Sequence, residues 1–282
     1  MKPYRGKTPS QENKELGGIT VNKSLCKWSR QVNKMCPYEE MLNMIMNDVA
    51  RKKIRCEGKQ CLKILLKETG YTDEKEMMSA RFSDLLKPHG PADSTNLLSN
   101  LDIEAVMEEF SRASIKKEPY YPNGPFYHIK FEMSDFMKSI TSELRDIDFN
   151  KMKSTGFKTF GCVLNTDVWS GQGKHWVCIF GSFTKDKNDK ELIDVEYFNS
   201  SGRPVDMYPT LLDWVDFKKK QGYNIKIRTV LPYQGVQESK TECGVWCLFY
   251  IQCRLEGKVP LHFIKKKTTD DHMIEGRGFL FV

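Results

Sequence analysis

One cysteine of the sequence stands where a thiol can act as a nucleophile. Cys243 lies between a polar turn that begins at Gln237 and an apolar run, 245–251, long enough to form a buried helix. The sequence therefore predicts Cys243 at a helix N-terminus, where unpaired backbone N–H groups and the helix dipole favour a thiolate over a thiol. Gly244 has no side chain, so a substrate backbone can approach the sulfur. This pattern indicates the nucleophile of a cysteine peptidase.

Such a nucleophile needs a base and a group that orients the base. His175 follows a glycine-bearing loop and opens a predicted strand, from where its imidazole can take the proton of Cys243 and return it to a leaving amine. Asn199 follows the predicted strand 192–198, and its amide oxygen can accept one imidazole N–H. Gln237 can donate its amide hydrogens to an oxyanion beside Cys243. Taken singly, His175 also fits a structural role and Asn199 an ordinary turn.

Two regions are expected to position these groups. Residues 1–115 are predicted to form an N-terminal helical arm, of which 1–24 are a loose lead-in, and residues 116–282 a cysteine protease core. Apolar residues at helical spacing predict the arm helices, the last of which Asp102 is expected to cap. In the core, strands are expected at 160–164, 175–180, 192–198 and 224–231, and helices at 211–217, after Cys243 and beyond residue 264. The fold class is α+β, with a small mixed sheet packed against the cysteine-bearing helix.

Composition narrows the class of protein further. The chain has 282 residues, of which 39% are hydrophobic and 11% aromatic, and this content excludes wholesale disorder. The 44 Lys and Arg against 37 Asp and Glu give a net charge of +7, which fits either weak nucleic-acid binding or an ordinary basic surface. No apolar run approaches the roughly 20 residues of a membrane span, and the N-terminal residues show no secretory signal.

The cysteines are not spaced like a metal site or a disulfide framework. There are nine of them, and the pair Cys56 and Cys61 has no nearby histidine or second pair, so no zinc is expected. Apolar surroundings predict that several others are small core residues in a reducing compartment, namely Cys162, Cys178, Cys247 and Cys253. No metal or organic cofactor is implied, because a thiol, an imidazole and an amide suffice for the chemistry.

The order of the candidate residues along the chain points to a family. His175, Asn199, Gln237 and Cys243 follow one another, and an aromatic residue comes directly after the histidine. This order resembles the superfamily of adenovirus proteases and SUMO proteases, whereas papain-like enzymes put the cysteine first. The blocks 160–167, 173–177, 196–200 and 241–244 look like those of the polyprotein-protease family of African swine fever virus. Asn199, in place of the Asp usual in SUMO proteases, points the same way. The resemblance runs from about residue 75 to about residue 275.

The resemblance implies a viral maturation protease with a SUMO-protease-like core. Such enzymes cut structural polyproteins at Gly-Gly-Xaa sites, and the expected location is the host cytoplasm, at virus assembly sites, and the virion. Trp176 is expected to roof a narrow slot that admits only small residues, and Asn165 and Trp169 to line the cleft. A core position for Trp176 stays open as an alternative.

Two other functions remain open at this point. One is an isopeptidase that removes SUMO or ubiquitin from lysines and uses the helical arm to bind the folded modifier. The other is a binding protein on a retired peptidase fold, which predicts the loss of at least one site residue, although all four are present.

Overall fold

The computed structural model describes Pro88, residues 90–115, 121–259 and 268–281, and two short strands, β1 (Lys14–Leu16) and β2 (Ile19–Val21), which pair with each other. The chain divides into two compact units. One comprises residues 16–19 and 93–277, and the other residues 1–15, 20–92 and 278–282. All the candidate catalytic residues lie in the 93–277 unit. The arm helices that the sequence predicts before Pro88 lie outside the described residues.

A mixed sheet forms the centre of the 93–277 unit. Its strands are β3 (Phe126–His128), β4 (Glu132–Met133), β5 (Thr159–Asn165), β6 (Trp176–Lys185), β7 (Glu191–Phe198) and β8 (Ile225–Val230). The order is β3-β5-β6-β7-β8, with β4 also pairing with β5. The β5–β6 and β6–β7 pairs are antiparallel and the others parallel. The four strands predicted from apolar runs are present, and so is the predicted small mixed sheet.

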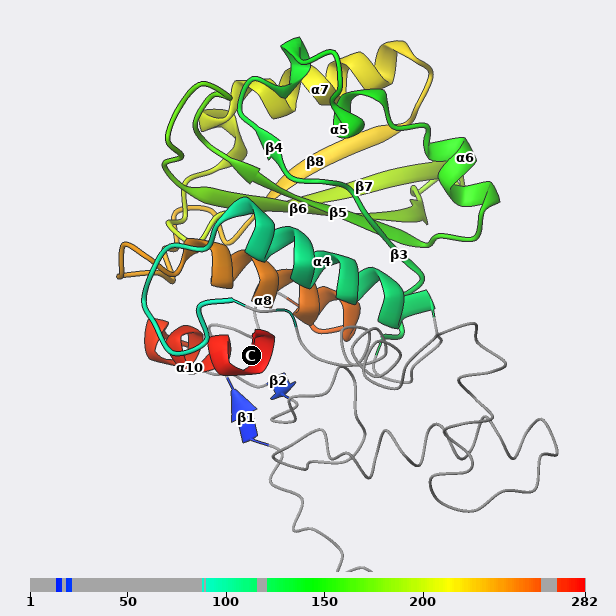
Figure 1. Ribbon diagram of the computed structural model, residues 1–282. Coiled ribbons are helices and arrows are strands. Elements are labelled where there is room, and N and C mark those ends of the chain that lie inside the picture. Colours follow the sequence, from blue (N-terminus) through cyan, green and yellow to red (C-terminus); the bar gives the residue numbers. More distant parts are fainter. Residues whose placement is uncertain are drawn as a thin grey trace, which may run out of the picture. The chain divides into compact units, whose positions relative to one another are not determined.

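Helices cover both faces of this sheet (Figure 1). One face carries α5 (Glu143–Asp146), α6 (Phe149–Ser154) and α7 (Pro209–Lys220), and the other carries α4 (Asn100–Ile115) and α8 (Cys243–Leu255). Further described helices are α10 (Asp270–Leu280) and the 3-10 turns η1 (Phe136–Lys138) and η2 (Val205–Met207). Because both faces are covered, β5 is buried along its whole length, which explains why its sequence is apolar without alternation.

Contacts between α8 and β7 fix the position of the cysteine-bearing helix. Tyr250 of α8 stacks on Phe198 of β7 with ring centroids 4.4 Å apart and planes 3° from parallel. The carboxylate of Glu196, also on β7, is buried and accepts hydrogen bonds of 2.6 Å from the Tyr250 hydroxyl and from Arg254 Nε. A buried carboxylate with two such donors is satisfied rather than costly. These contacts hold α8 against the sheet and so determine where its N-terminus lies.

The start of α4 differs from the sequence prediction in one detail. Ser99, not Asp102, is the cap: its hydroxyl accepts the N–H of Asp102 at 3.2 Å, and Asp102 Oδ2 accepts the N–H of Ser99 at 2.7 Å. This reciprocal pair is a capping box, in which the acidic residue stands inside the first turn. The predicted apolar face is buried, at Ile103, Val106, Met107 and Phe110.

Helix α4 packs on the core although the sequence assigns it to the arm. The hydroxyl of Ser111 donates to the carbonyl of Phe126 at 2.9 Å, and Glu104 accepts the N–H of Phe131 at 2.5 Å. The division at residue 115 stays a prediction. In the structure α4, which lies on the arm side of that division, belongs to the 93–277 unit.

The cysteines that the sequence predicts as core residues lie in the core. The four cysteines predicted as core residues, Cys162, Cys178, Cys247 and Cys253, are buried free thiols. Within the described part of the chain, no group of three or more His, Cys, Asp or Glu is arranged to hold a metal ion. No helix of that part has the length and apolar character needed to cross a bilayer.

Candidate active site

Cys243 is the first residue of α8, as the sequence predicts, and it is only 2% exposed. Burial raises the pKa of its thiol to about 11, although backbone hydrogen bonds from Trp176, Gly244 and Cys243 itself lower it. Desolvation therefore outweighs the helix N-terminus. The helix position predicts a thiolate, whereas the burial of Cys243 favours the thiol.

His175 and Asn199 lie at the same end of two neighbouring strands. Strand β6 begins directly after His175, and the antiparallel β7 ends directly before Asn199. The imidazole Nε2 lies 2.8 Å from Asn199 Oδ1. The sheet thus brings together the two residues that the sequence predicts as base and orienting group.

The other hydrogen bonds of Asn199 show which of its amide atoms faces the histidine. The backbone N–H and the hydroxyl of Ser201 both donate to Asn199 Oδ1, at 3.0 and 2.8 Å. Asn199 Nδ2 donates to the hydroxyl of Tyr197 at 3.1 Å. A backbone N–H can only donate, so the atom beside Ser201 is an oxygen, and His175 Nε2 must carry the hydrogen that it shares with this oxygen. In the neutral ring, Nδ1 then keeps its lone pair.

The surroundings of His175 favour the neutral imidazole. Burial lowers the pKa of His175 below its usual 6.5, the hydrogen bond to Asn199 raises it, and the positive charge of Arg203 lowers it. The lowering prevails, so at pH 7 the ring is neutral and Nδ1 can accept a proton. The lowered pKa of His175 and the raised pKa of Cys243 both favour a thiol and a neutral imidazole over a thiolate and an imidazolium.

Trp176 connects the histidine with the cysteine. Its backbone N–H is hydrogen-bonded to Cys243 and lowers the pKa of the thiol. This contact places the sulfur beside the residue that follows His175. The indole of Trp176 is 7% exposed, and its Nε1 donates to the carbonyl of Leu98 at 3.0 Å. The indole is therefore fixed in place, and its role as the roof of a substrate slot stays a prediction.

Leu98, which the sequence gives no reason to select, covers the start of α8. A Cβ atom at Gly244 would lie 3.1 Å from Cβ of Leu98, tighter than ordinary contact. The missing side chain of Gly244 therefore makes room for Leu98, the residue whose carbonyl also holds Trp176. The predicted approach of a substrate backbone at Gly244 stays a prediction.

Gln237 is held against the residue that follows Asn199. Gln237 Oε1 accepts from the hydroxyl of Ser200 at 2.5 Å, and Gln237 Nε2 donates to the carbonyl of Ser239 at 2.8 Å. The backbone N–H of Gln237 donates to the carbonyl of Ser200 at 3.1 Å. An amide nitrogen carries two hydrogens, so one hydrogen of Nε2 is left for another acceptor. Ser200 is fully buried, and the sequence suggests only a turn residue there.

Asp270 of α10 holds the turn that precedes Cys243. Its Oδ2 accepts the backbone N–H groups of Glu238 and Ser239 at 2.7 and 2.6 Å. Its Oδ1 accepts from Trp246 Nε1 at 2.7 Å. One carboxylate thus ties the turn to the first part of α8. No local pattern marks Asp270, because its partners are distant in sequence.

Arg277, also on α10, pairs with the residue immediately before the cysteine. Its Nε and Nη2 donate to the carboxylate of Glu242 at 2.9 and 3.0 Å, and both side chains are fully buried. Removing one partner of such a pair would leave an uncompensated buried charge, which is strongly destabilising. The backbone entering Cys243 is thus fixed from α10.

The loop before β6 is ordered by Asn165, one of the predicted cleft residues. Asn165 is 4% exposed, and its Oδ1 accepts the N–H groups of Asp167 and Lys174 at 2.9 and 3.0 Å. Trp169, in the same loop, is 74% exposed and stacks on Phe131 with centroids 6.3 Å apart. Asn165 therefore shapes the approach to His175, and contact with substrate stays a prediction for both Asn165 and Trp169.

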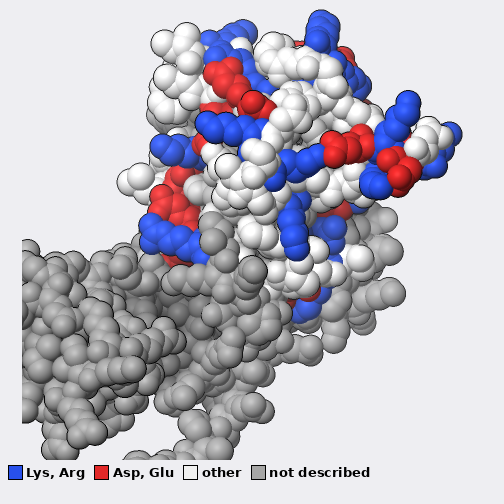
Figure 2. Space-filling model, turned by 90° about the vertical axis from the view of Figure 1, so that its right-hand side faces the viewer, with Lys and Arg blue, Asp and Glu red and all other residues white. Residues whose placement is uncertain are grey.

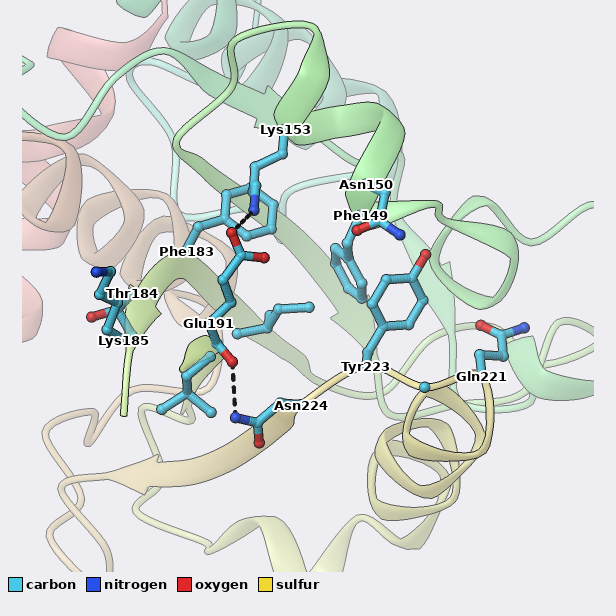
Figure 3. A pocket seen from close by; sticks show the side chains of 13 residues that line it. Phe149, Asn150, Lys153, Phe183, Thr184, Lys185, Glu191, Gln221, Tyr223 and Asn224 are labelled. Carbon is cyan, nitrogen blue, oxygen red and sulfur yellow. Dashed lines mark hydrogen bonds and ion pairs between the residues drawn. The ribbon is translucent and has the colours of Figure 1, made fainter. Parts of the chain in front are cut away.

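Two pockets lie at opposite ends of β6 and β7. The first, of about 310 Å³, is lined by His175 and Asn199 among others. The second, of about 660 Å³, lies where β6 ends and β7 begins and is lined in part by the rings of Phe149, Phe183 and Tyr223 (Figure 3). No histidine or cysteine is among the residues that line the second pocket.

Comparison with known proteins places the chain in a family. No protein-family model matches the chain. The SUMO-1 cysteine protease of African swine fever virus (isolate Tick/South Africa/Pretoriuskop Pr4/1996) is 30% identical over 279 residues, which cover 94% of this chain and 98% of that protein. The corresponding cysteine protease of the Vero-adapted Badajoz 1971 strain shows the same identity and coverage. A putative thiol protease of Acanthamoeba polyphaga mimivirus is 26% identical over 177 residues, which cover 61% of this chain and 52% of that protein.

A solved structure supports the same relationship. The crystal structure of the African swine fever virus protease matches with a TM-score of 0.64 and 27% identity, covering 95% of this chain and 99% of that one. The resemblance stated from the motifs around His175, Asn199 and Cys243 is confirmed, and so is the predicted fold of the core. Identity of 30% over nearly the full length of both chains leads to one conclusion: this chain belongs to the family of the African swine fever virus cysteine protease.

Proposed function

We propose that this chain is an endopeptidase that cleaves viral structural polyproteins at Gly-Gly-Xaa sites during virion maturation. The observation that carries the proposal is the 2.8 Å hydrogen bond between His175 and Asn199, together with a buried Cys243 that is hydrogen-bonded to the backbone of Trp176, the residue after His175. The relatives named above come from large DNA viruses, which supports a viral setting. The corresponding locations are host-cell assembly sites and the virion.

The first step follows from the neutral resting pair. Cys243 attacks the carbonyl carbon of the scissile bond while His175 Nδ1 accepts the thiol proton. The lowered pKa of His175 and the raised pKa of Cys243 both oppose an ion pair in the free enzyme. Proton transfer therefore accompanies attack on the bound substrate.

The oxyanion formed by this attack has two donors in our proposal. One is the remaining hydrogen of Gln237 Nε2, and the other is the backbone N–H of Cys243. Donors held in place before the reaction stabilise the developing charge without reorganising. The hydrogen bond from Ser200 to Gln237 Oε1 supplies that fixed orientation.

The second half of the reaction uses the same histidine in reverse. The imidazolium of His175 protonates the leaving amine, and the neutral ring then activates a water that hydrolyses the thioester on Cys243. Asn199 keeps the ring in one plane throughout, because its Oδ1 is itself held by Ser201.

We attribute the proposed preference for small residues next to the scissile bond to Leu98 and Trp176, which cover the start of α8. Leu98 lies against Gly244, and its carbonyl fixes the indole of Trp176. A side chain on the substrate residue that enters this space would clash, which discriminates more strongly than the loss of a contact.

A peptide probe tests the proposal directly. An electrophilic Gly-Gly peptide should label Cys243 alone, as mapped by mass spectrometry, and the label should be lost in His175→Ala. Cys253→Ala, which removes another buried thiol, is the matched control and should keep the label. Labelling of several cysteines, or of none, would contradict an activated Cys243.

One alternative has a specific observation behind it. Three relatives carry the name SUMO-1 cysteine protease, so an isopeptidase acting on SUMO–lysine conjugates is the second candidate. Competition between such a conjugate and a Gly-Gly polyprotein junction separates the two, since the proposed endopeptidase should cleave the junction first.

The prediction that this protein binds nucleic acid weakly rests on its net charge of +7 alone. On the face shown in Figure 2, positive side chains are interspersed with negative ones. If the basic surface holds DNA weakly, the measured affinity should fall steeply as salt is added.

A further inference from the structure

The pocket beside His175 and Asn199 has a cation that the mechanism does not use. Arg203 lines this pocket of about 310 Å³ together with those two residues. Its side chain is exposed, and among the described residues it has no hydrogen-bond or ion-pair partner. We call this space the histidine-side pocket. It contains both apolar surface, from Met207 and Tyr208, and an available positive charge.

The lining of the histidine-side pocket indicates which part of a substrate it faces. His175 must stand between the sulfur and the leaving nitrogen, because it protonates that nitrogen. The acyl part of the substrate stays on Cys243, and the amine part departs past the imidazole. The pocket is lined by His175 and Asn199 but by no residue of the Gln237–Gly244 turn and not by Trp176. A pocket on the amine side of the scissile bond would have this lining, with the histidine and without the cysteine.

The charge in the pocket is of one sign. No Asp or Glu is among the residues that line it. Three carboxylates are adjacent in sequence to lining residues, those of Asp135, Asp167 and Asp206. Asp135 accepts the backbone N–H of Trp169 at 3.0 Å, Asp167 pairs with Lys174 at 2.8 Å, and Asp206 is exposed. Arg203 also lies close enough to His175 to lower the pKa of the imidazole, which agrees with a cation at the pocket wall.

We propose that the histidine-side pocket is a subsite for an acidic residue located one or two positions after the scissile bond, and that Arg203 is the residue that selects it. A guanidinium presents paired N–H donors that match a carboxylate, while Met207 and Tyr208 contact the apolar part of the side chain. The inference rests on the proposed endopeptidase function, because it names the substrate class of the same active site.

Matched peptides test the selectivity. A Gly-Gly-Xaa series carries Asp, Asn or Lys at the first or the second position after the bond. Wild type should cleave the Asp peptide with kcat/KM about fivefold above the Asn peptide, the size expected for a partly exposed charge pair. Arg203→Gln should bring that ratio to within about twofold of one, Arg203→Lys should keep part of it, and Arg203→Glu should favour Lys. Because exposed charges are screened, the ratio in wild type should fall as salt is added.

The control replaces an exposed cation elsewhere. Lys187→Glu changes the charge on the loop between β6 and β7, at the end of the sheet far from His175, and should leave the Asp:Asn ratio unchanged. A ratio that changes equally in Lys187→Glu and Arg203→Glu would overturn the inference, since net charge alone would then explain it.

Binding provides a readout that does not depend on turnover. Product peptides that begin at the residue after the bond should bind the inactive Cys243→Ala protein, measured by fluorescence anisotropy, about fivefold more tightly with Asp than with Asn. Arg203→Gln in that background should abolish the difference. Labelling of Cys243 by the Gly-Gly probe, with equal rates and affinities for Asp and Asn, would overturn this inference alone. Absence of labelling and of cleavage would overturn the proposed function and this inference with it.

Discussion

The pockets at the two ends of strands β6 and β7 differ in whether their polar groups already have hydrogen-bond or ion-pair partners. At the hairpin end, the larger pocket has its charges paired: Lys153 binds Glu191, and Asn224 Nδ2 donates to the carbonyl of Glu191 at 2.8 Å (Figure 3). Its rings are also paired, with Phe149 edge-on to Tyr223 at 5.2 Å. The volume there is about 660 Å³, twice that at the other end.

At the histidine end, the smaller pocket is lined by groups that can still form a hydrogen bond or an ion pair. His175 uses Nε2 for Asn199 and keeps Nδ1, and Arg203 has no partner among the described residues. The comparison teaches that unused bonding capacity in a fixed geometry, rather than cavity size, marks the chemical site in this fold.

The largest effect should come from removing the nucleophile or the base. Cys243→Ala and His175→Ala should each lower kcat/KM on a Gly-Gly peptide by at least about 10³-fold, because each removes a group that takes part in bond making. Circular dichroism should show an unchanged fold. Substantial cleavage by folded Cys243→Ala would show that the site lies elsewhere.

The next largest effect should be seen in the alkylation rate of Cys243, which depends on the protonation state of its thiol. With a pKa of about 11, Cys243 should react with iodoacetamide about 300-fold more slowly at pH 7 than a free cysteine of pKa near 8.5, because its thiolate fraction is smaller by that factor. The rate should still be rising above pH 9. A fast rate that is constant from about pH 5 upward would instead reveal a preformed thiolate–imidazolium pair.

Asn199→Ala should have a smaller effect, about 10- to 100-fold on kcat/KM, since an orienting residue contributes less than the base it orients. Its hydrogen bond raises the pKa of His175, so its loss should lower that pKa. The acid limb of the kcat/KM profile, where His175 becomes neutral, should accordingly move to lower pH. A shift to higher pH would contradict the assigned direction of this hydrogen bond.

The hairpin end should give the smallest effect. Glu191→Gln and Lys153→Met break an ion pair whose side chains are 76% and 37% exposed, so the free energy of unfolding should change by at most about 1 kcal/mol. Cleavage of a Gly-Gly peptide should stay within about twofold of wild type. A change beyond about fivefold would show that the two ends are coupled along β6 and β7.

Much of the catalytic core could be predicted because its signals are local. Apolar runs gave the strands that flank His175 and Asn199, and the change from polar turn to apolar helix gave Cys243. The strands β3 and β4 were missed because three and two residues are too short to show alternation. The bonds of Leu98 and Asp270 were missed because their partners are distant in sequence.

The protonation state of Cys243 could not be predicted for a different reason. The helix N-terminus is visible in the sequence, but the burial that opposes it depends on the assembled core. Only the structure shows that the thiol is 2% exposed, and only then does the balance favour the thiol over the thiolate.

The contacts of α10 have a consequence for when the enzyme becomes competent during synthesis. A growing chain that has passed residue 259 already contains His175, Asn199, Gln237 and Cys243. It still lacks Asp270 and Arg277, which tie down the turn and the residue before the cysteine. We therefore expect a nascent polypeptide, or one terminated before α10, to be inert, so that proteolysis starts only after the ribosome has synthesised α10.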